Sequence, residues 1–477
     1  MTGVADGRLA TAQRGPSADA PPPPGGDGAP GHRSPTAPGA GILLGAQNRN
    51  AVHPGFLTDT GRPLFDPGLE AMPAAERRAR QLAAIEREWE RAWQLPFYQE
   101  RYRKAGLTPG VFPGLDAIPL TRKSDLRLNE AVHPPFGTHR SVPLHDAVRI
   151  SRSTGTTGKP WYTFYTIDDI ERMREIDHTI HWRAGYRPGM HYSLSFPQNL
   201  YPTNVNGGRS MRDAGMLEIP VGVPFSLDDA INHIHVWQEL GVDILMLSLP
   251  QFNLYDEAAK SIGIELPELL DGRIVAMIEL SMQWEAPRRR MENAFNVRIR
   301  NTYGVSDCIG FSCLDGDAHS GMAQPIDYYV IQICDPETGR EVTPGTPGHL
   351  VVTMFGMDQF MMRFDSEDLV VERTDPCPTG STLMRWDYLG RIPDMAVIGA
   401  SRILPVHVQL ELEAFGAPEF GIGAGTVDTL RVKVEHPDAD LIARHLSDRL
   451  GVPATVESLP SGSLPRSAYK PRRLAAD

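Results

Sequence analysis

The strongest constraint on the fold is the alternation of strand-like and helix-like segments between residues 191 and 280. HYSLSF (191–196), VDILMLS (242–248) and RIVAMIEL (273–280) are apolar runs of strand length. Between the first two lies LDDAINHIHVWQELG (227–241), which has the apolar spacing of an amphipathic helix. Strand, helix and strand in this order favour a largely parallel sheet covered by helices, so the predicted fold class is α/β.

The rest of the chain divides by composition. Its 477 residues predict two or three domains. Residues 1–62 are rich in Pro, Gly, Ala and Ser, as in PPPPGGDGAPG (21–31), and predict a disordered tail. Residues 74–390 form the predicted large domain. After YLGRIPDMAVIGASRILP (388–405) the pattern becomes a small α+β one, so a boundary near Arg391 gives a second domain over 391–477.

Two helices are expected early in the large domain. Leu82, Ile85, Trp89 and Trp93 fall on one helical stripe, and Pro96 is expected to stop that helix. IPLTRKSDL (118–126) predicts a turn that leads into a second helix, with Thr121 or Ser124 as its cap.

Charge and composition exclude several classes of protein. A formal net charge of −12 argues against a general nucleic-acid binder, which carries a basic face. No segment offers about 18 consecutive apolar residues, so no membrane span is expected. The first 20 residues do not resemble a secretory signal, and the four cysteines do not form a disulfide framework. We therefore expect a cytoplasmic protein with reduced thiols.

The segment STGTTGKP (153–160) has the composition of an anion-binding turn. Backbone N–H groups of such a turn can converge on a phosphate, and hydroxyls and a lysine add further donors. It is not a Walker A loop, because Pro160 follows Lys159 where that motif has Ser or Thr. From the pattern alone, such a segment is more often a solvated polar turn than a phosphate-binding loop.

Three later motifs, in order along the chain, give this loop a context. They are NTYGVSD (301–307), MRFDSEDL (362–369) and GRIPDM (390–395). Together with the loop, the series resembles the adenylate-forming enzymes. LPFYQERYRKAGL, IPLTRKSDLR and GSLPRSAYKPRRL are similar to the phenylacetate–CoA ligase branch. The resemblance implies a large layered N-terminal adenylation domain with parallel-type sheets and a small mobile α+β C-terminal domain.

The resemblance also implies an activity and a set of roles. ATP and Mg²⁺ would activate a carboxylic acid as its acyl-adenylate, and coenzyme A would then take the acyl group. Tyr303 would stack on adenine, Asp368 and Arg391 would hold the ribose, and Asp307 would bind Mg²⁺. Ser306 and Lys470 would be catalytic. The phosphate loop would comprise Ser153, Thr154, Gly155, Thr156, Thr157, Gly158 and Lys159.

The implied substrate is an aryl or arylacetic acid. The segment SFPQNLYPTN (195–204) matches the one that shapes the acyl pocket in the family, so Phe196, Tyr201 and Asn204 are the candidate lining residues. The sequence leaves the number of subunits open, with a homodimer among the options.

Departures from the family pattern keep other acceptors open. Pro393 occupies the hinge position and Ala400 replaces a glycine in the loop that lines the pantetheine tunnel of relatives. Delivery of the acyl group to an amine or a carrier protein is therefore an alternative, and a non-catalytic nucleotide-binding scaffold is a second one.

A degenerate zinc site is the remaining candidate. Cys313, His319 and Cys377 stand in the order of a zinc set found in some relatives, but Thr379 occupies the fourth position. Structural zinc takes four N or S ligands, so the sequence argues against bound zinc.

Overall fold

The computed structural model describes residue 56 and residues 61–153, 161–196, 200, 207–308, 312–316, 318–416, 418–423, 428–464 and 473–474. Most of the predicted tail lies outside these residues. Near its end, Phe56 is fully buried and its ring lies 4.9 Å from that of Phe65 and 5.5 Å from that of Trp182. The domain boundaries at residues 62 and 391 stay predictions.

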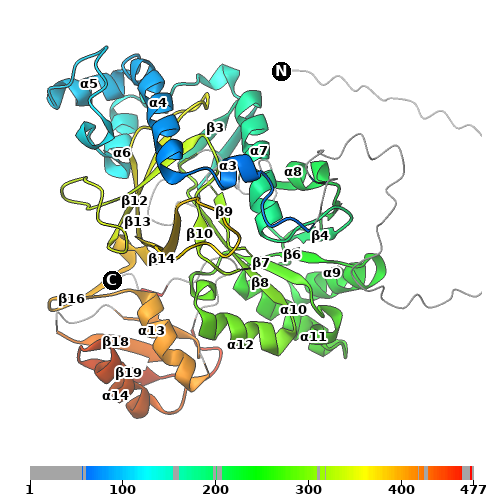
Figure 1. Cartoon of the computed structure of the whole chain (residues 1–477). Coiled ribbons are helices and arrows are strands. Elements are labelled where there is room, and N and C mark those ends of the chain that lie inside the picture. Colours follow the sequence, from blue (N-terminus) through cyan, green and yellow to red (C-terminus); the bar gives the residue numbers. More distant parts are fainter. Residues whose placement is uncertain are drawn as a thin grey trace, which may run out of the picture. The chain divides into compact units, whose positions relative to one another are not determined.

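The predicted parallel sheet is present. Its strand order is β5 (Leu217–Ile219), β4 (His191–Leu194), β6 (Ile244–Met246), β7 (Ile274–Met277), β8 (Arg298–Gly304) and β9 (Ser312–Leu314). Neighbouring strands pair in parallel from β5 to β8, and only β8 and β9 are antiparallel. The α/β prediction is confirmed, and Figure 1 shows the helices alongside the sheet.

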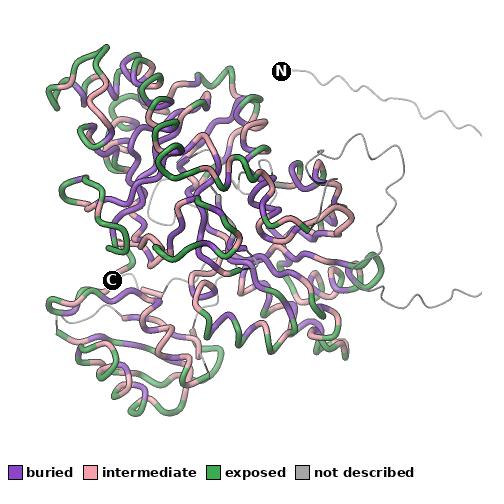
Figure 2. Tube along the Cα trace, viewed as in Figure 1, coloured by how far each residue is buried: buried purple, intermediate pink, exposed green. Residues whose placement is uncertain are grey.

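Both faces of this sheet are buried. Ile244, Ile274 and Ala276 belong to a core cluster that includes residues of α7 (Ile167–Arg183) and α8 (Gly207–Asp213). The intervening Leu245 and Val275 belong to a second cluster with α9 (Leu227–Leu240), α10 (Leu249–Ser261) and α12 (Glu285–Phe295). Alternating side chains of a strand point to opposite faces, which is why continuous apolar runs are required here. Figure 2 shows the strands of this sheet as mostly buried.

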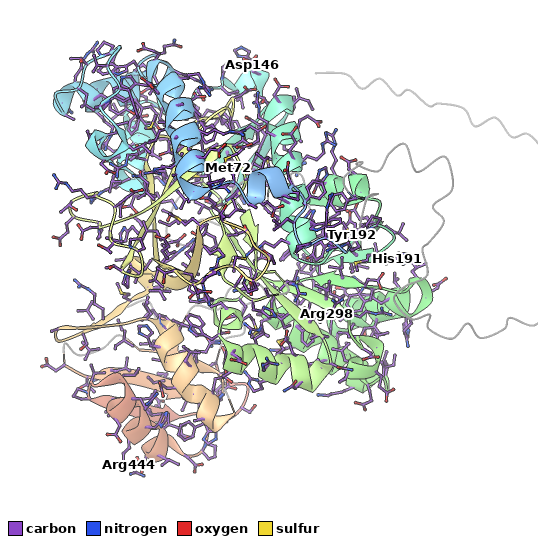
Figure 3. All side chains as sticks on the ribbon, in the orientation of Figure 1. Met72, Asp146, His191, Tyr192, Arg298 and Arg444 are labelled. Atoms are coloured by element: carbon purple, nitrogen blue, oxygen red, sulfur yellow. The ribbon has the colours of Figure 1, made fainter. Side chains whose placement is uncertain are left out.

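The direction of the strands determines where a site can form. His191 and Arg298, labelled in Figure 3, mark the amino ends of β4 and β8. The residues that follow the carboxyl ends of these strands, Phe196 and Asp307, therefore lie at the opposite edge. In open α/β sheets, ligands bind at this carboxyl edge.

A second, antiparallel sheet follows in the sequence. Its order is β10 (Met322–Ala323), β14 (Arg385–Arg391), β13 (Phe364–Glu372), β12 (Pro347–Met354) and β11 (Tyr329–Cys334). The short β1 (Thr121–Arg122) pairs with β13 in parallel. A separate hairpin is formed by β2 (Arg149–Arg152) and β3 (Tyr162–Tyr165), which flank the predicted phosphate loop.

The N-terminal helices follow the predicted stripe, and the difference from the prediction lies in the cap of the second helix. Ile85 and Trp89 of α4 (Ala74–Ala92) are buried. The helix ends before Pro96, as predicted, and Pro96 begins α5 (Pro96–Lys104). The helix α6 (Lys123–Val132) is capped by Asp125, whose carboxylate accepts from the Arg122 N–H at 3.1 Å. The predicted cap at Thr121 is wrong, because that hydroxyl donates to the Met362 carbonyl at 2.7 Å.

The C-terminal segment has its own small core. A sheet of β17 (Phe420–Ile422), β18 (Leu430–Val434) and β19 (Ala454–Ser458) packs with α13 (Pro405–Leu412) and α14 (Ala439–Leu450). A separate hairpin comprises β15 (Ala396–Ile398) and β16 (Ser401–Ile403). The alternation predicted for β18 is confirmed: Leu430, Val432 and Val434 are buried. None of the helices in the described chain combines the length and apolarity that crossing a bilayer requires.

The amphipathic helix α14 provides a test of this core. Leu446 is fully buried there, whereas Leu441 in the same helix is 50% exposed. Leu446→Ala leaves a cavity and is expected to reduce the free energy of unfolding of this segment by about 2–5 kcal/mol. Leu441→Ala is the matched control, with a change within about 0.5 kcal/mol. Hydrogen exchange of the β18 amides at increasing urea measures both, and equal effects would contradict the burial of Leu446.

Candidate active site

The centre of the candidate site is the carboxylate of Asp368 in β13, which is 2% exposed. Its Oδ2 accepts from the Tyr303 hydroxyl at 2.6 Å. Its Oδ1 accepts from Arg391 Nε at 2.9 Å and from the Tyr388 hydroxyl at 3.3 Å. Tyr303 belongs to β8, while Tyr388 and Arg391 belong to β14. The structure therefore brings together three predicted site residues where the two sheets meet.

A β-bulge makes this convergence feasible. Asp368 is directly opposite Arg391, and Leu369 is opposite Gly390, but Val370 is opposite Tyr388. One extra residue thus interrupts β14 between Tyr388 and Arg391. Side chains three positions apart on a regular strand would face opposite sides, and the extra residue returns both to the face of Asp368.

The electrostatics keep these groups in fixed protonation states. Burial and the adjacent Asp368 carboxylate raise the pKa of Tyr303 well above its usual value, and the same two causes act on Tyr388. The negative charge of Asp368 raises the pKa of the Arg391 guanidinium. Both tyrosines therefore stay neutral hydrogen-bond donors, and Arg391 stays a cation, at any physiological pH.

A turn directly after β8 carries the next two predicted residues. Asp307 is 9% exposed, and its Oδ2 accepts from Lys123 Nζ at 2.8 Å. Its Oδ1 is buried and has no hydrogen-bond partner among the described residues. The backbone carbonyl of Ser306 accepts from the Thr163 hydroxyl at 3.1 Å. An orphaned carboxylate oxygen is a ready ligand for a hard cation, so Asp307 offers one oxygen ligand to an ion such as Mg²⁺.

The Thr163 contact links this turn to the predicted phosphate loop. Ser153, the residue after β2, donates its N–H to the Trp161 carbonyl at 2.9 Å, and its hydroxyl accepts from the Trp161 N–H at 2.9 Å. These two bonds close the base of the loop. The six other predicted loop residues, Thr154 to Lys159, lie outside the described residues, so the structure reports only the position of the base.

The predicted acyl-pocket segment begins at the carboxyl end of β4. Phe196 is buried there. The hydroxyl of the preceding Ser195 lies 3.1 Å from the Tyr255 hydroxyl, which in turn lies 2.8 Å from His233 Nδ1. Tyr201 and Asn204 lie outside the described residues. His233 is thus a partner of the hydroxyl pair formed by Ser195 and Tyr255.

The predicted catalytic lysine of the C-terminal motif, Lys470, also lies outside the described residues. Arg473 and Leu474, just beyond it, lie against β17. Arg473 donates to the Phe420 carbonyl at 2.8 Å, and its guanidinium lies 4.4 Å from the centre of the Phe420 ring. Leu474 forms an isolated bridge with Ile422. The end of the motif is thus part of the C-terminal segment.

Sequence reasoning missed three residues of this site. Tyr388 joins Asp368 through the bulge, and a bulge leaves no periodic signal. Lys123 lies in the IPLTRKSDL segment, which predicts the start of a helix but no part in the site. Its ammonium nevertheless reaches Asp307. Glu367 lies beside them: burial and Asp365 raise its pKa, and Lys123 acts in the opposite direction.

The three zinc candidates make other contacts. His319 Nδ1 lies 2.8 Å from Asp315 Oδ2, and Cys377 Sγ lies 3.1 Å from the Thr379 hydroxyl. Cys313 is 1% exposed on β9. In the part of the chain that the structure describes, no group of three or more His, Cys, Asp and Glu residues is arranged to hold a metal.

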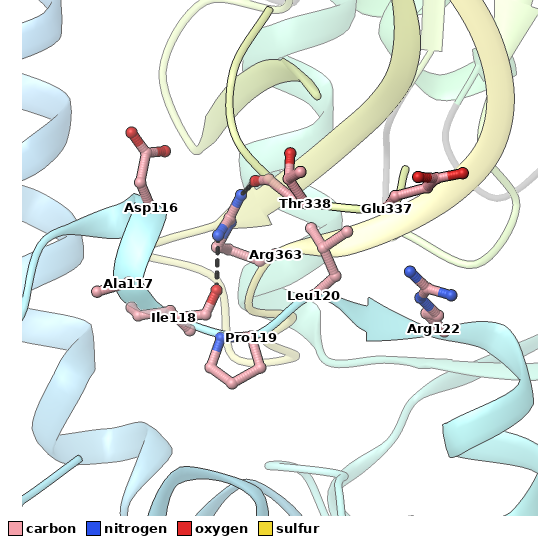
Figure 4. Close-up of a pocket in the computed structure, with 10 residues that line it drawn as sticks. Asp116, Ala117, Ile118, Pro119, Leu120, Arg122, Glu337, Thr338 and Arg363 are labelled. Carbon is pink, nitrogen blue, oxygen red and sulfur yellow. Dashed lines mark hydrogen bonds between the residues drawn. The ribbon is translucent and has the colours of Figure 1, made fainter. Parts of the chain in front are cut away.

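A surface pocket of about 340 Å³ lies apart from this chemistry. Figure 4 shows Arg363 in its wall, donating to the Ile118 carbonyl at 2.6 Å. Arg363 also donates to the Gly339 carbonyl, and Arg122 donates to the Pro336 carbonyl at 2.6 Å. None of the described residues that line it is a predicted site residue. Its arginines hold backbone carbonyls of neighbouring turns, so we assign the pocket no role in the site.

The Cys377 thiol yields a titration test. Burial raises its pKa, but hydrogen bonds with Thr379 and Ser320 outweigh burial and lower it to about 7. Burial raises the pKa of the Cys308, Cys313 and Cys334 thiols. Iodoacetamide should alkylate Cys377 faster than the other three cysteines, and the alkylation rate should reach half its maximum near pH 7. Peptide mass spectrometry measures the label at each cysteine.

Thr379→Val removes a hydrogen bond that stabilises the thiolate, so the midpoint of Cys377 labelling should move to higher pH. Thr379→Ser keeps the hydroxyl and is the matched control. A midpoint that is the same in all three proteins would show that Thr379 does not lower this pKa.

Known proteins are similar to this chain over most of its length. No protein-family model matches the chain. It is 27% identical over 444 residues to a phenylacetate–coenzyme A ligase of Thermus thermophilus, covering 85% of this chain and 97% of that protein. A second such ligase, from Escherichia coli, is 25% identical over 440 residues, covering 86% and 97%.

Among solved structures, 2-hydroxyisobutyryl-CoA ligase in complex with 2-HIB-AMP superposes with a TM-score of 0.80. It is 22% identical, and the match covers 88% of this chain and 93% of that one. These similarities confirm the resemblance seen in the motifs: over most of its length this chain is similar to the phenylacetate–CoA ligases, and its fold is that of the adenylate-forming CoA ligases.

Proposed function

We propose that this protein is an ATP-dependent acid–thiol ligase that converts a carboxylic acid to an acyl-adenylate and then to a coenzyme A thioester. The observation that carries the proposal is the buried Asp368 carboxylate with Tyr303 and Arg391 beside it, at the carboxyl edge of the parallel sheet. The phenylacetate–coenzyme A ligases to which the chain is similar support the same reaction.

The reaction has two steps. A carboxylate oxygen of the acid attacks the α-phosphorus of ATP, the bond to the bridging oxygen breaks, and pyrophosphate leaves. The thiol sulfur of coenzyme A, after losing its proton, then attacks the acyl carbon, and AMP leaves with the electron pair of the acyl–oxygen bond. Adenylation makes the second step feasible, because AMP is a good leaving group from the acyl carbon and oxide is a very poor one.

Asp368 is the proposed ribose ligand. A carboxylate offers about four lone-pair positions, so its three protein donors leave capacity for a ribose hydroxyl. The guanidinium of Arg391 and the hydroxyls of Tyr303 and Tyr388 orient the carboxylate and keep it charged. In this proposal the ring of Tyr303 contributes the stacking surface for adenine.

The phosphates would be held from three sides. The loop from Ser153 to Lys159, whose base is closed beside Thr163, would donate to the β- and γ-phosphates. Asp307 would hold Mg²⁺, which when bound neutralises negative charge on the phosphates of ATP during the reaction. Ser306 and Lys470 would donate to the α-phosphate or to the attacking carboxylate, where negative charge builds up.

The proposal also specifies the class of acid and the acceptor of the acyl group. We propose an aryl or arylacetic acid, with Phe196, Tyr201 and Asn204 lining its pocket. Coenzyme A is the proposed acceptor. An amine or a carrier protein is the alternative acceptor. The reason is that the chain departs from the family pattern at Pro393, in the turn Ile392–Asp394, and at Ala400, beside Gly399 in the hairpin tip.

The ribose assignment predicts how Asp368→Asn changes nucleotide selectivity. The wild type should prefer ATP to 2′-deoxy-ATP by about 10- to 100-fold in kcat/KM, because a hydrogen bond to a charged acceptor contributes about 1.5–3 kcal/mol. Asp368→Asn should lower kcat/KM for ATP and bring the two nucleotides within a few fold of each other.

Asp256→Asn is the control for this experiment, because Asp256 forms an exposed ion pair with Lys260 at 2.7 Å, away from the site. It should keep the wild-type preference for ATP. A variant Asp368→Asn that retained full discrimination against 2′-deoxy-ATP would remove Asp368 from the ribose site.

The overall function is tested by pyrophosphate release over a panel of aliphatic, aryl and arylacetic acids. Release should depend on the acid and require no acceptor for the first turnover. Lys470→Ala should reduce it by about 100- to 1,000-fold, since one charge-stabilising donor is lost. Lys433→Ala, which removes an exposed cation paired with Glu457 at 3.4 Å, is the control and should leave release unchanged.

The second half of the assay identifies the acceptor. Adding coenzyme A should give sustained turnover and an acyl thioester detectable by mass spectrometry. Turnover that responds to amines and ignores coenzyme A would establish the amide-forming alternative. Wild-type protein that releases no pyrophosphate with any acid would favour the nucleotide-binding scaffold.

A further inference from the structure

The ion pair between Lys123 and Asp307 is unusual in its surroundings. Lys123 Nζ lies 2.8 Å from Asp307 Oδ2, and the side chains are 29% and 7% exposed. The two residues are 184 positions apart in sequence and come from α6 and from the turn after β8. A carboxylate this buried needs a compensating charge, and here the ammonium provides it.

The position of Lys123 in its helix does not stabilise the ammonium. Lys123 is the first residue of α6, where the helix dipole places partial positive charge. A cation is disfavoured at this end of a helix, so the dipole does not help to retain it. Lys123 is attracted instead by carboxylates outside the helix, Asp307 and Glu367.

Space beside Asp307 is limited. The cavity that it lines together with Thr163, Gln359 and the cation Arg140 has a volume of about 20 Å³, which is enough for about one water molecule, and Lys123 does not line it. Mg²⁺ usually keeps several waters. A hydrated divalent cation does not fit this cavity, so it would have to reach the carboxylate on the side that the Lys123 ammonium occupies at 2.8 Å, where the two cations would repel each other.

We propose that Lys123 is a place-holding cation, which pairs with Asp307 in the metal-free protein and has to be displaced before a divalent cation can bind that carboxylate. Lys123 is thus a positioning residue that suppresses metal binding until nucleotide arrives. This inference rests on the assignment of Asp307 as the metal ligand in the proposed function. The flexible, partly exposed lysine side chain allows the displacement without movement of α6.

The test measures Mn²⁺ binding to nucleotide-free protein, with the concentration of free Mn²⁺ determined by electron paramagnetic resonance. Lys123→Met keeps the length of the side chain and removes the charge. It should bind Mn²⁺ about tenfold more tightly than the wild type. Lys123→Arg should bind as weakly as the wild type. The matched control Lys260→Met, which breaks an exposed lysine–aspartate pair of similar length, should leave Mn²⁺ binding unchanged.

Thermal unfolding provides a second measurement on the same proteins. Lys123→Met leaves the Asp307 carboxylate buried without its counter-ion, so its Tm should fall below that of the wild type and rise again with added MgCl₂. The wild-type Tm should respond far less to MgCl₂. The double variant Lys123→Met/Asp307→Asn should lose both the tight Mn²⁺ binding and the response to MgCl₂. If Lys123→Met does not fold, Lys123→Gln serves in its place.

Two results would overturn the inference: Mn²⁺ binding of the lysine variants equal to the wild type, or a gain in Mn²⁺ affinity that persists when Asp307 is also replaced. Neither depends on acid activation. Absence of pyrophosphate release would overturn the proposed function while leaving the Mn²⁺ result standing, so the two failures are distinguishable.

Discussion

The site depends on one physical constraint, the burial of the Asp368 carboxylate where the two sheets meet. A charge removed from water needs several donors to replace its hydration, and no single element of this fold supplies them. One comes from β8 of the parallel sheet and two come from β14 of the antiparallel sheet. The carboxylate therefore ties together the geometry of both sheets at the position proposed to receive a nucleotide.

The same edge collects acidic side chains, each beside a basic partner. Asp368 is paired with Arg391, and Asp307 is paired with Lys123. Such pairs can exchange partners when a ligand with its own charges arrives, because each partly buried charge only requires some counter-charge nearby. An anionic nucleotide that carries a divalent cation brings both signs at once, so this arrangement suits it better than an uncharged ligand.

Local pattern predicted most of the elements. The apolar runs near residues 191, 242 and 273 became β4, β6 and β7 because strands buried on both faces require uninterrupted apolar residues. The pattern erred at the start of α6, where the partner of the Thr121 side chain lies far away in sequence. The Thr121 hydroxyl contacts residue 362, and no local window contains that contact.

The sequence by itself determined the α/β class, the order of the motifs, and the residue types able to bind a nucleotide, because periodicity and motif chemistry are properties of neighbouring residues. The tertiary structure decided which of these groups meet. The extra residue in β14 brings Tyr388 to Asp368, and the packing of α6 brings Lys123 to Asp307 across 184 residues of sequence. Such pairings are set by strand register and by the compensation of buried charge, which depend on the whole fold.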